Sequence, residues 1–119
     1  MIEIQLATDS QIQPNGTIKG EFHWKLEKAP KNLEVHLLWY TSGRGTEDVE
    51  IIETEHITTS GNVGQSYFSF NLPNEPYSFS GKLITLTWAI EVVATSPDET
   101  KKIEFMLSPT GREVSLAPN

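Results

Sequence analysis

The sequence predicts an all-β protein, a seven-stranded antiparallel β-sandwich of immunoglobulin-like kind. Three observations lead to this fold class. Apolar residues recur at every second position, turn residues interrupt the pattern at short intervals, and no helical periodicity separates the runs. A closed barrel would show the same periodicity, so the sequence leaves that architecture open.

The predicted strands follow this alternation along the chain. Residues 2–8 and 18–26 are separated by Pro14-Asn15-Gly16, a sequence that suits a tight turn because Pro presets φ and Asn-Gly accepts a positive φ. The later strands cover residues 33–40, 47–57, 67–72, 82–94 and 103–107. The run 47–57 loses its phase at Ile52, which predicts a bulge or a position at a sheet edge.

The aromatic residues predict one hydrophobic core, because they share the phase of the aliphatic residues in their strands. These residues are Phe22, Trp24, Trp39, Phe68, Phe70, Trp88 and Phe105. We therefore assign residues 1–108 to a single β-sandwich domain and residues 109–119 to a C-terminal tail. Within the tail, Val114 and Leu116 alternate around Ser115 and could add as a short strand.

Composition excludes several classes of function. Sixteen acidic residues against nine Lys and Arg give a net charge of −7, which argues against nucleic acid as a partner. The sequence has no cysteine, so it can form neither a disulfide nor a thiolate metal site. No apolar run is long enough for a membrane span. The first residues alternate like a strand and do not resemble a signal peptide, so we expect a cytoplasmic protein.

Part of the chain resembles the arrestin fold family. The segment 14–22 carries a turn glycine, a hydrophobic residue and a second glycine, as the second strand of arrestin-like proteins does. Phe68-Ser69-Phe70-Asn71-Leu72-Pro73 is followed by Pro76-Tyr77-Ser78-Phe79-Ser80-Gly81 and then by Leu86-Thr87-Trp88-Ala89-Ile90-Glu91-Val92. These three motifs, together with the segment 14–22, occur in the order and at the spacing typical of that family, across residues 14–93.

The resemblance implies a non-enzymatic scaffold or adaptor that binds other proteins, without cofactors. The family includes arrestins, arrestin-domain adaptors and the retromer sorting subunit, which this sequence resembles. Those proteins usually carry two such sandwiches, whereas this chain has length for one. A single-domain variant and a homodimer that recreates the pair both stay open. Proline residues at 73 and 76, Phe79 and Gly81 also have a structural interpretation, as residues that end one strand and turn the chain into the next.

The sequence contains no motif for catalysis. His23, His36 and His56 lie on three separate predicted strands, all facing away from the core, and we interpret them as surface residues with no metal site. Ser78 and Ser80 lack the Gly-x-Ser-x-Gly pattern of serine hydrolases. The acidic run at 47–55 could attract calcium or a basic partner, but it is also typical of a solvated edge strand.

One outward-facing group of residues is a candidate for protein binding. Leu38 and Tyr40 face away from the core, His36 lies on the same side, and Arg44 follows just beyond. We predict that these four residues contact a protein partner. The alternative function is a carbohydrate- or small-ligand-binding module that uses Tyr40, Tyr67 and His36 as a stacking platform.

Overall fold

The computed structural model describes residues 1–43, 47–58, 61–81, 83–110 and 114–115, and these residues form strands, turns and loops without a helix. The long strands are β1 (Ile2–Leu6), β3 (Thr17–Lys25), β4 (Asn32–Gly43), β5 (Val49–His56), β6 (Val63–Asn71), β8 (Ile84–Thr95) and β9 (Glu99–Leu107). Three strands of two residues each are added to them, namely β2 (Gln11–Ile12), β7 (Phe79–Ser80) and β10 (Val114–Ser115).

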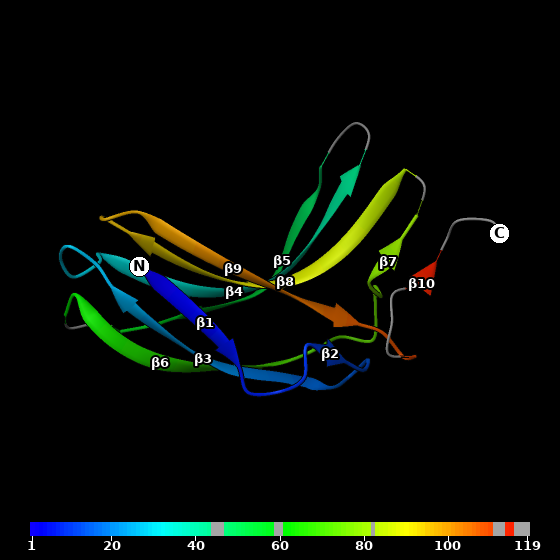
Figure 1. Cartoon of the computed structure of the whole chain (residues 1–119), viewed down its shortest axis with the longest axis horizontal. Helices are drawn as coiled ribbons and strands as arrows, with labels where there is room; N and C mark the ends of the chain where they lie inside the picture. The colour runs from blue at the N-terminus through cyan, green and yellow to red at the C-terminus, as the bar shows by residue number, and fades with distance from the viewer. Residues whose placement is uncertain (44–46, 59–60, 82, 111–113, 116–119) are drawn as a thin grey trace.

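The strands form two sheets that face each other as a sandwich (Figure 1). The smaller sheet has the order β1-β3-β6, and the larger has the order β10-β7-β8-β4-β5, with β9 alongside β8. All pairs of long strands are antiparallel, as predicted, whereas β2 and β10 pair in parallel with β9 and β7. The immunoglobulin-like sandwich is therefore confirmed, and the closed barrel is excluded.

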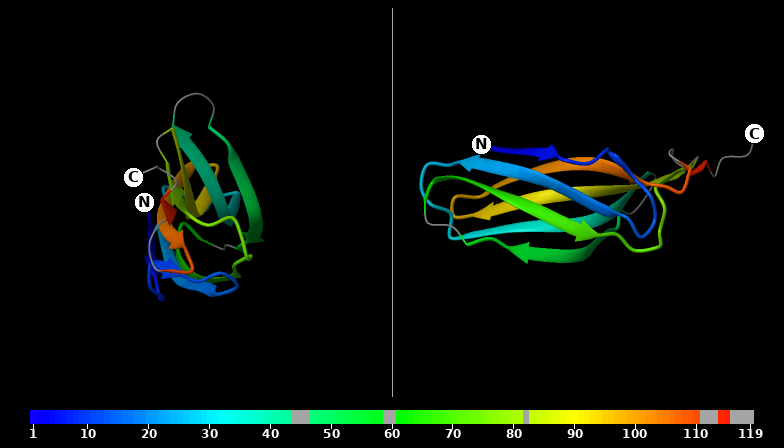
Figure 2. Two further views of the ribbon diagram at one scale, coloured as in Figure 1. Left: turned by 90° about the vertical axis from the view of Figure 1, so that its right-hand side faces the viewer. Right: turned by 90° about the horizontal axis from the view of Figure 1, so that it is seen from below.

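The larger sheet is longer than the smaller one. The β4–β5 hairpin and the first half of β8 extend past the end of the β1-β3-β6 sheet (Figure 1), and the molecule measures 52 × 30 × 18 Å. Seen from below, the smaller sheet lies in front of the larger sheet (Figure 2, right). The hairpin thus projects where no second layer covers it.

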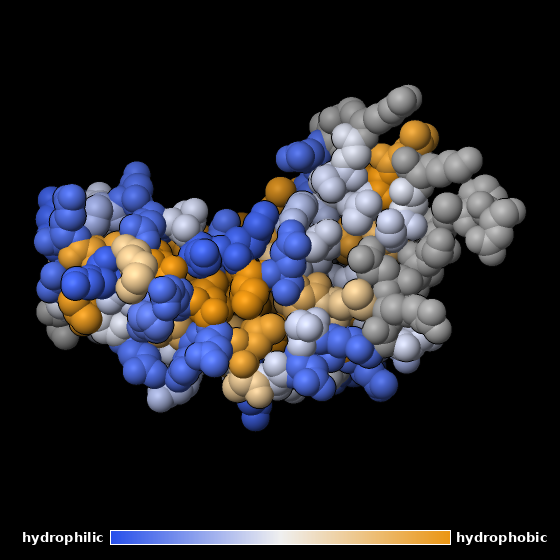
Figure 3. All heavy atoms as spheres, viewed as in Figure 1, coloured by the Kyte–Doolittle hydropathy of each residue, from blue (hydrophilic) through white to orange (hydrophobic). Residues whose placement is uncertain are grey.

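The predicted core is present between the sheets. Six of the seven aromatic residues assigned to it are buried, and Trp39 is partly buried at its margin. Trp88 has no exposed surface, and its indole Nε1 donates to the Pro76 carbonyl at 2.8 Å. On one side of the sandwich the seam between β1 and β9 exposes apolar atoms between hydrophilic borders (Figure 3).

Two glycines in the smaller sheet are required by close contacts. A Cβ at Gly20 would lie 2.5 Å from the Phe68 ring and 2.6 Å from the Gln5 carbonyl. A Cβ at Gly64 would lie 2.2 Å from the Trp24 indole. β6 begins at Val63, four positions before the predicted start at residue 67, because Val63 and Gly64 pair with Lys25 and Trp24 of β3.

Other strand limits also differ from the prediction. β4 continues to Gly43, three positions past the predicted end at Tyr40, because Ser42 and Gly43 pair with Thr85 and Ile84 of β8. β9 begins at Glu99, four positions before the predicted start, because it pairs with the end of β8. The tail adds a strand at Val114–Ser115 as expected, and Leu116 lies outside the described residues.

Candidate functional site

The predicted contact residues lie on the outer face of the larger sheet, with one correction. His36 and Tyr40 project from β4 on this face and are partly buried. Leu38 lies between them, but only 4% of it is exposed, because it is opposite Ala89 on β8 and Ile51 on β5. The expectation that Leu38 is available to a partner is therefore wrong. Arg44 lies outside the described residues.

Tyr40 is held by two residues of β9. Its hydroxyl donates to the Glu104 carboxylate, and the Lys102 ammonium lies 4.1 Å from the centroid of its ring. Burial, followed by the hydrogen bond and the negative charge of Glu104, raises the pKa of Tyr40 to about 12. Tyr40 therefore remains a neutral hydrogen-bond donor at physiological pH and is fixed in place across three strands.

His36 lies between two carboxylates on the same face. Its Nε2 is 3.1 Å from a Glu34 oxygen, and its Nδ1 is 3.8 Å from a Glu91 oxygen on β8. His23 is on the smaller sheet, 3.1 Å from Glu3, and His56 is exposed on β5. Within the described residues, no group of three or more His, Cys, Asp or Glu side chains could hold a metal ion.

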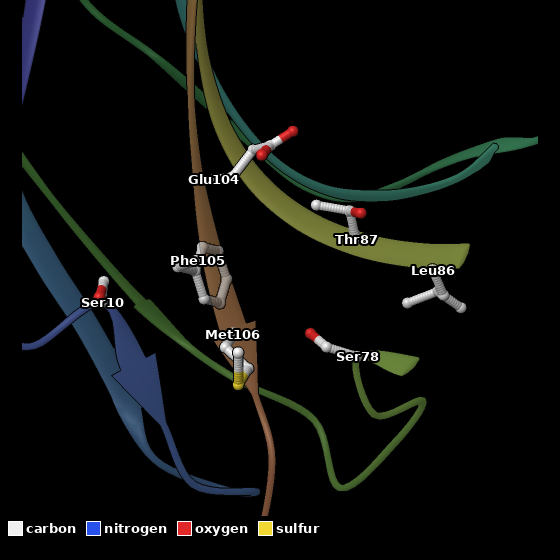
Figure 4. A pocket seen from close by; sticks show the side chains of 7 residues that line it. All are labelled: Ser10, Ser78, Leu86, Thr87, Glu104, Phe105 and Met106. Carbon is white, nitrogen blue, oxygen red and sulfur yellow. The ribbon is translucent and has the colours of Figure 1, made fainter. Parts of the chain in front are cut away.

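A pocket of about 260 Å³ opens where β8 changes its partner strand (Figure 4). β8 pairs with β7 at Leu86 and with β9 from Trp88 onward. The two partner strands diverge at this point and form a fork between β7 and β9. The pocket is lined by Ser10, Ser78, Leu86, Thr87, Glu104, Phe105 and Met106. Sequence reasoning singled out Ser78 as part of a motif, but Ser10 and Met106 carried no signal, because only the fork brings them together.

Two polar side chains of this pocket, Ser78 and Glu104, already have partners within the protein. The Leu107 amide donates to the Ser78 hydroxyl oxygen at 3.0 Å, and the Ser78 amide donates to the Leu107 carbonyl at 2.8 Å. Glu104 accepts from Tyr40. The Pro-x-Ser-Phe-x-Gly motif therefore attaches the loop before β7 to β9, which is a structural role.

A larger groove of about 680 Å³ lies against the smaller sheet. It is lined by residues of β1, β3 and β6 on both sides of Gly20, together with Glu55 of β5. Tyr67, at this groove, is 67% exposed. The predicted platform of Tyr40, Tyr67 and His36 does not form, because Tyr67 is on one sheet and the other two residues are on the other.

The β4–β5 hairpin carries several exposed apolar residues of the larger sheet. All eight residues of β5 are exposed, and Val49, Ile51 and Ile52 are 62%, 50% and 37% exposed. β5 ends the strand order of the larger sheet within the described residues, and the pairing with β4 shifts between Leu37 and Leu38. The loss of phase at Ile52 thus reflects both an irregularity in the pairing and an edge position.

Comparison with known proteins connects this geometry to one fold. No protein-family model matches the sequence, and a search of curated proteins gives no match. Among solved structures, the chain is similar to the sporulation control protein Spo0M from Bacillus subtilis, with a TM-score of 0.67 over 90% of this chain. The protein has an arrestin-like fold.

The similarity to Spo0M is one of architecture. The two sequences share 16% identity, and this chain spans about half of that protein, since the match covers 48% of it. The fold expected from the three sequence motifs is therefore confirmed. The described residues also contain no helix that could cross a membrane.

Proposed function

We propose that this protein is a non-enzymatic scaffold or adaptor that binds a protein partner through the β4–β5 hairpin and the adjoining face around Tyr40. The observation that carries the proposal is the hairpin itself, which projects past the smaller sheet and exposes Val49 and Ile51 by half or more. Exposed apolar residues on a projecting element are typical of protein-binding surfaces. A cytoplasmic location fits a chain that contains no cysteine.

Site-specific photo-cross-linking tests this proposal in cells that make the full chain. A photoreactive residue at Ile51 should give a discrete adduct, whereas one at Val63 should not. Val63 is the matched control, because it is 61% exposed but lies on β6 of the other sheet. The pair of changes Val49→Ser and Ile51→Ser should remove partner capture, and Val63→Ser should retain it.

We expect these substitutions to preserve the fold, because each of the three side chains is exposed by half or more. Thermal unfolding of each variant should therefore match that of the parent protein. Equal cross-linking from positions 51 and 63, or no adduct from either, would contradict a role for the hairpin.

The groove of the smaller sheet favours a second candidate function, the binding of a carbohydrate or small ligand. Tyr67 offers an exposed ring there, and Gln5, Lys19 and Glu21 offer polar groups beside it. Sugars are commonly bound by this combination of an aromatic face and hydrogen-bonding side chains. A polysaccharide pull-down that depends on Tyr67, and not on Tyr40, would support this function over the first.

A further inference from the structure

The free edge of β5 shows which chemistry the hairpin would select. β5 is the last strand of the larger sheet within the described residues, so half of its backbone groups point away from β4. An exposed edge of this kind can accept an additional strand through backbone hydrogen bonds. Its side chains then determine which sequences fit.

The hydrogen bonds to β4 identify the outward backbone groups. The Ile57 amide donates to the Leu33 carbonyl at 2.8 Å, and the Thr41 amide donates to the Asp48 carbonyl at 2.9 Å. Bonded and non-bonded pairs alternate in an antiparallel ladder. Starting from these two bonds, the N–H and C=O groups of Val49, Ile51, Thr54 and His56 point to the free edge.

The side chains of β5 separate into two rows with different chemistry. Glu50, Glu53 and Glu55 are opposite Trp39, Leu37 and Val35, so they share the inward-facing side of the sheet. Val49 and Ile51 are opposite Tyr40 and Leu38, so they share the outer face with Thr54 and His56 farther along the strand. A strand added at this edge would place alternate residues beside carboxylates, and the intervening residues beside Val49 and Ile51 in the first half of β5.

We propose that the β5 edge binds an extended segment of a partner protein in which basic and apolar residues alternate. This inference rests on the proposed function and names the partner's chemistry. Lysine or arginine side chains of the segment would lie beside Glu50, Glu53 and Glu55, and apolar side chains would lie beside Val49 and Ile51. Charge complementarity selects this occupant, because residues 47–56 contain five carboxylates and no lysine or arginine.

A second copy of the chain is a poorer occupant of the same edge. Pairing two β5 strands would bring Glu50, Glu53 and Glu55 of one copy next to the same residues of the other. Like charges on neighbouring strands destabilise pairing, and here each strand carries three on one face. The same repulsion keeps the edge from aggregating and leaves it available to a basic segment.

The test uses the full chain and a labelled peptide of about ten residues in which lysine alternates with valine, a length that suits one strand. Fluorescence anisotropy should show saturable binding that weakens as salt is raised. A peptide of the same composition with its lysines and valines in separate blocks should bind less well. A peptide that alternates glutamate with valine should not bind.

Two sets of variants distinguish this edge from general charge attraction. The triple variant E50K, E53K and E55K should weaken binding roughly tenfold, since it replaces three attractions by repulsions. The matched control is a second triple variant, D9K, E27K and E75K, which changes the net charge equally at exposed positions away from β5. The control should bind the alternating peptide almost as the parent does.

A proline tests the backbone contacts independently of charge. Thr54→Pro removes an N–H that points outward, so the ladder with β4 keeps its hydrogen bonds. It should abolish peptide binding, whereas Thr54→Ala should preserve it. Circular dichroism and thermal unfolding verify that both variants fold. If the proline destabilises the hairpin, the charge-reversed variant and the block peptide still test the inference.

The outcomes separate this inference from the function on which it rests. If the alternating peptide fails to bind, or binds equally to the T54P and charge-reversed variants, the inference is wrong. The scaffold proposal still stands in that case if Ile51 captures a partner by photo-cross-linking. A dimer in sedimentation velocity that T54P abolishes would identify a second copy as the occupant and would also overturn the inference.

Discussion

Trp88→Ala should remove most of the stability of the protein. The Trp88 side chain is fully buried at the centre of β8, and its ring centroid lies 6.0 Å from that of Phe105. Truncating a buried tryptophan costs about 3–5 kcal/mol. Loss of the hydrogen bond to the Pro76 carbonyl adds about 1 kcal/mol. Because domains are stable by about 5–15 kcal/mol, a loss of about 4–6 kcal/mol leaves little.

Urea denaturation followed by far-ultraviolet circular dichroism measures this loss. Trp88→Phe separates the two contributions, because it retains an aromatic ring but removes the indole N–H; we expect it to cost clearly less than the alanine variant. Trp39→Ala is a control at the same row of the sheet, since Trp39 pairs with Trp88 but is only partly buried. A loss below about 1 kcal/mol for Trp88→Ala would refute the assignment of Trp88 to the core.

Two further predictions concern the fork and the outer face. Ser78→Ala should lower the free energy of unfolding by about 1–3 kcal/mol, because it leaves the buried Leu107 amide without its acceptor. Ser80→Ala, at an exposed position, should change stability little. Equal effects of the two variants in urea denaturation would contradict the role of the Ser78 hydroxyl. Tyr40 has a folded-state pKa of about 12 against 10.0 for an ordinary tyrosine, so its stabilising contribution is complete below pH 10 and is lost as the pH rises through 12. Absorbance titration of tyrosinate should show a late component that Tyr40→Phe removes; a Tyr40 that ionises near 10 would contradict the burial and the Glu104 contact.

The sequence predicted strands well where one face packs against the core. β3 and β8 alternate cleanly, because every second residue, such as Phe22 or Trp88, has to be buried between the sheets. β2 and β7 were not identified, because two residues are too few to show a period. Their pairing depends on contacts between distant parts of the chain, such as Ile12 with Leu107.

The candidate site was predicted only in part, because its exposure depends on neighbours across strands. Leu38 follows the outward phase, as the alternation indicated, but Ala89 and Ile51 lie opposite it and it is covered. No local pattern in residues 33–40 could reveal that. The network of Tyr40 with Lys102 and Glu104 was missed for the same reason, since more than sixty positions separate Tyr40 from Glu104 in the sequence.

The irregular alternation of β5 and its proposed role have the same physical origin. A strand whose inward side covers a core must be apolar there, as β4 is at Val35 and Leu37. β5 lies at the sheet edge, where its inward side covers no core, and that side carries Glu50, Glu53 and Glu55 instead. Because β5 is not buried, its sequence does not have to alternate regularly, and it can carry a row of carboxylates beside the apolar residues Val49 and Ile51. A basic strand added there would complete the edge without requiring any change in the core.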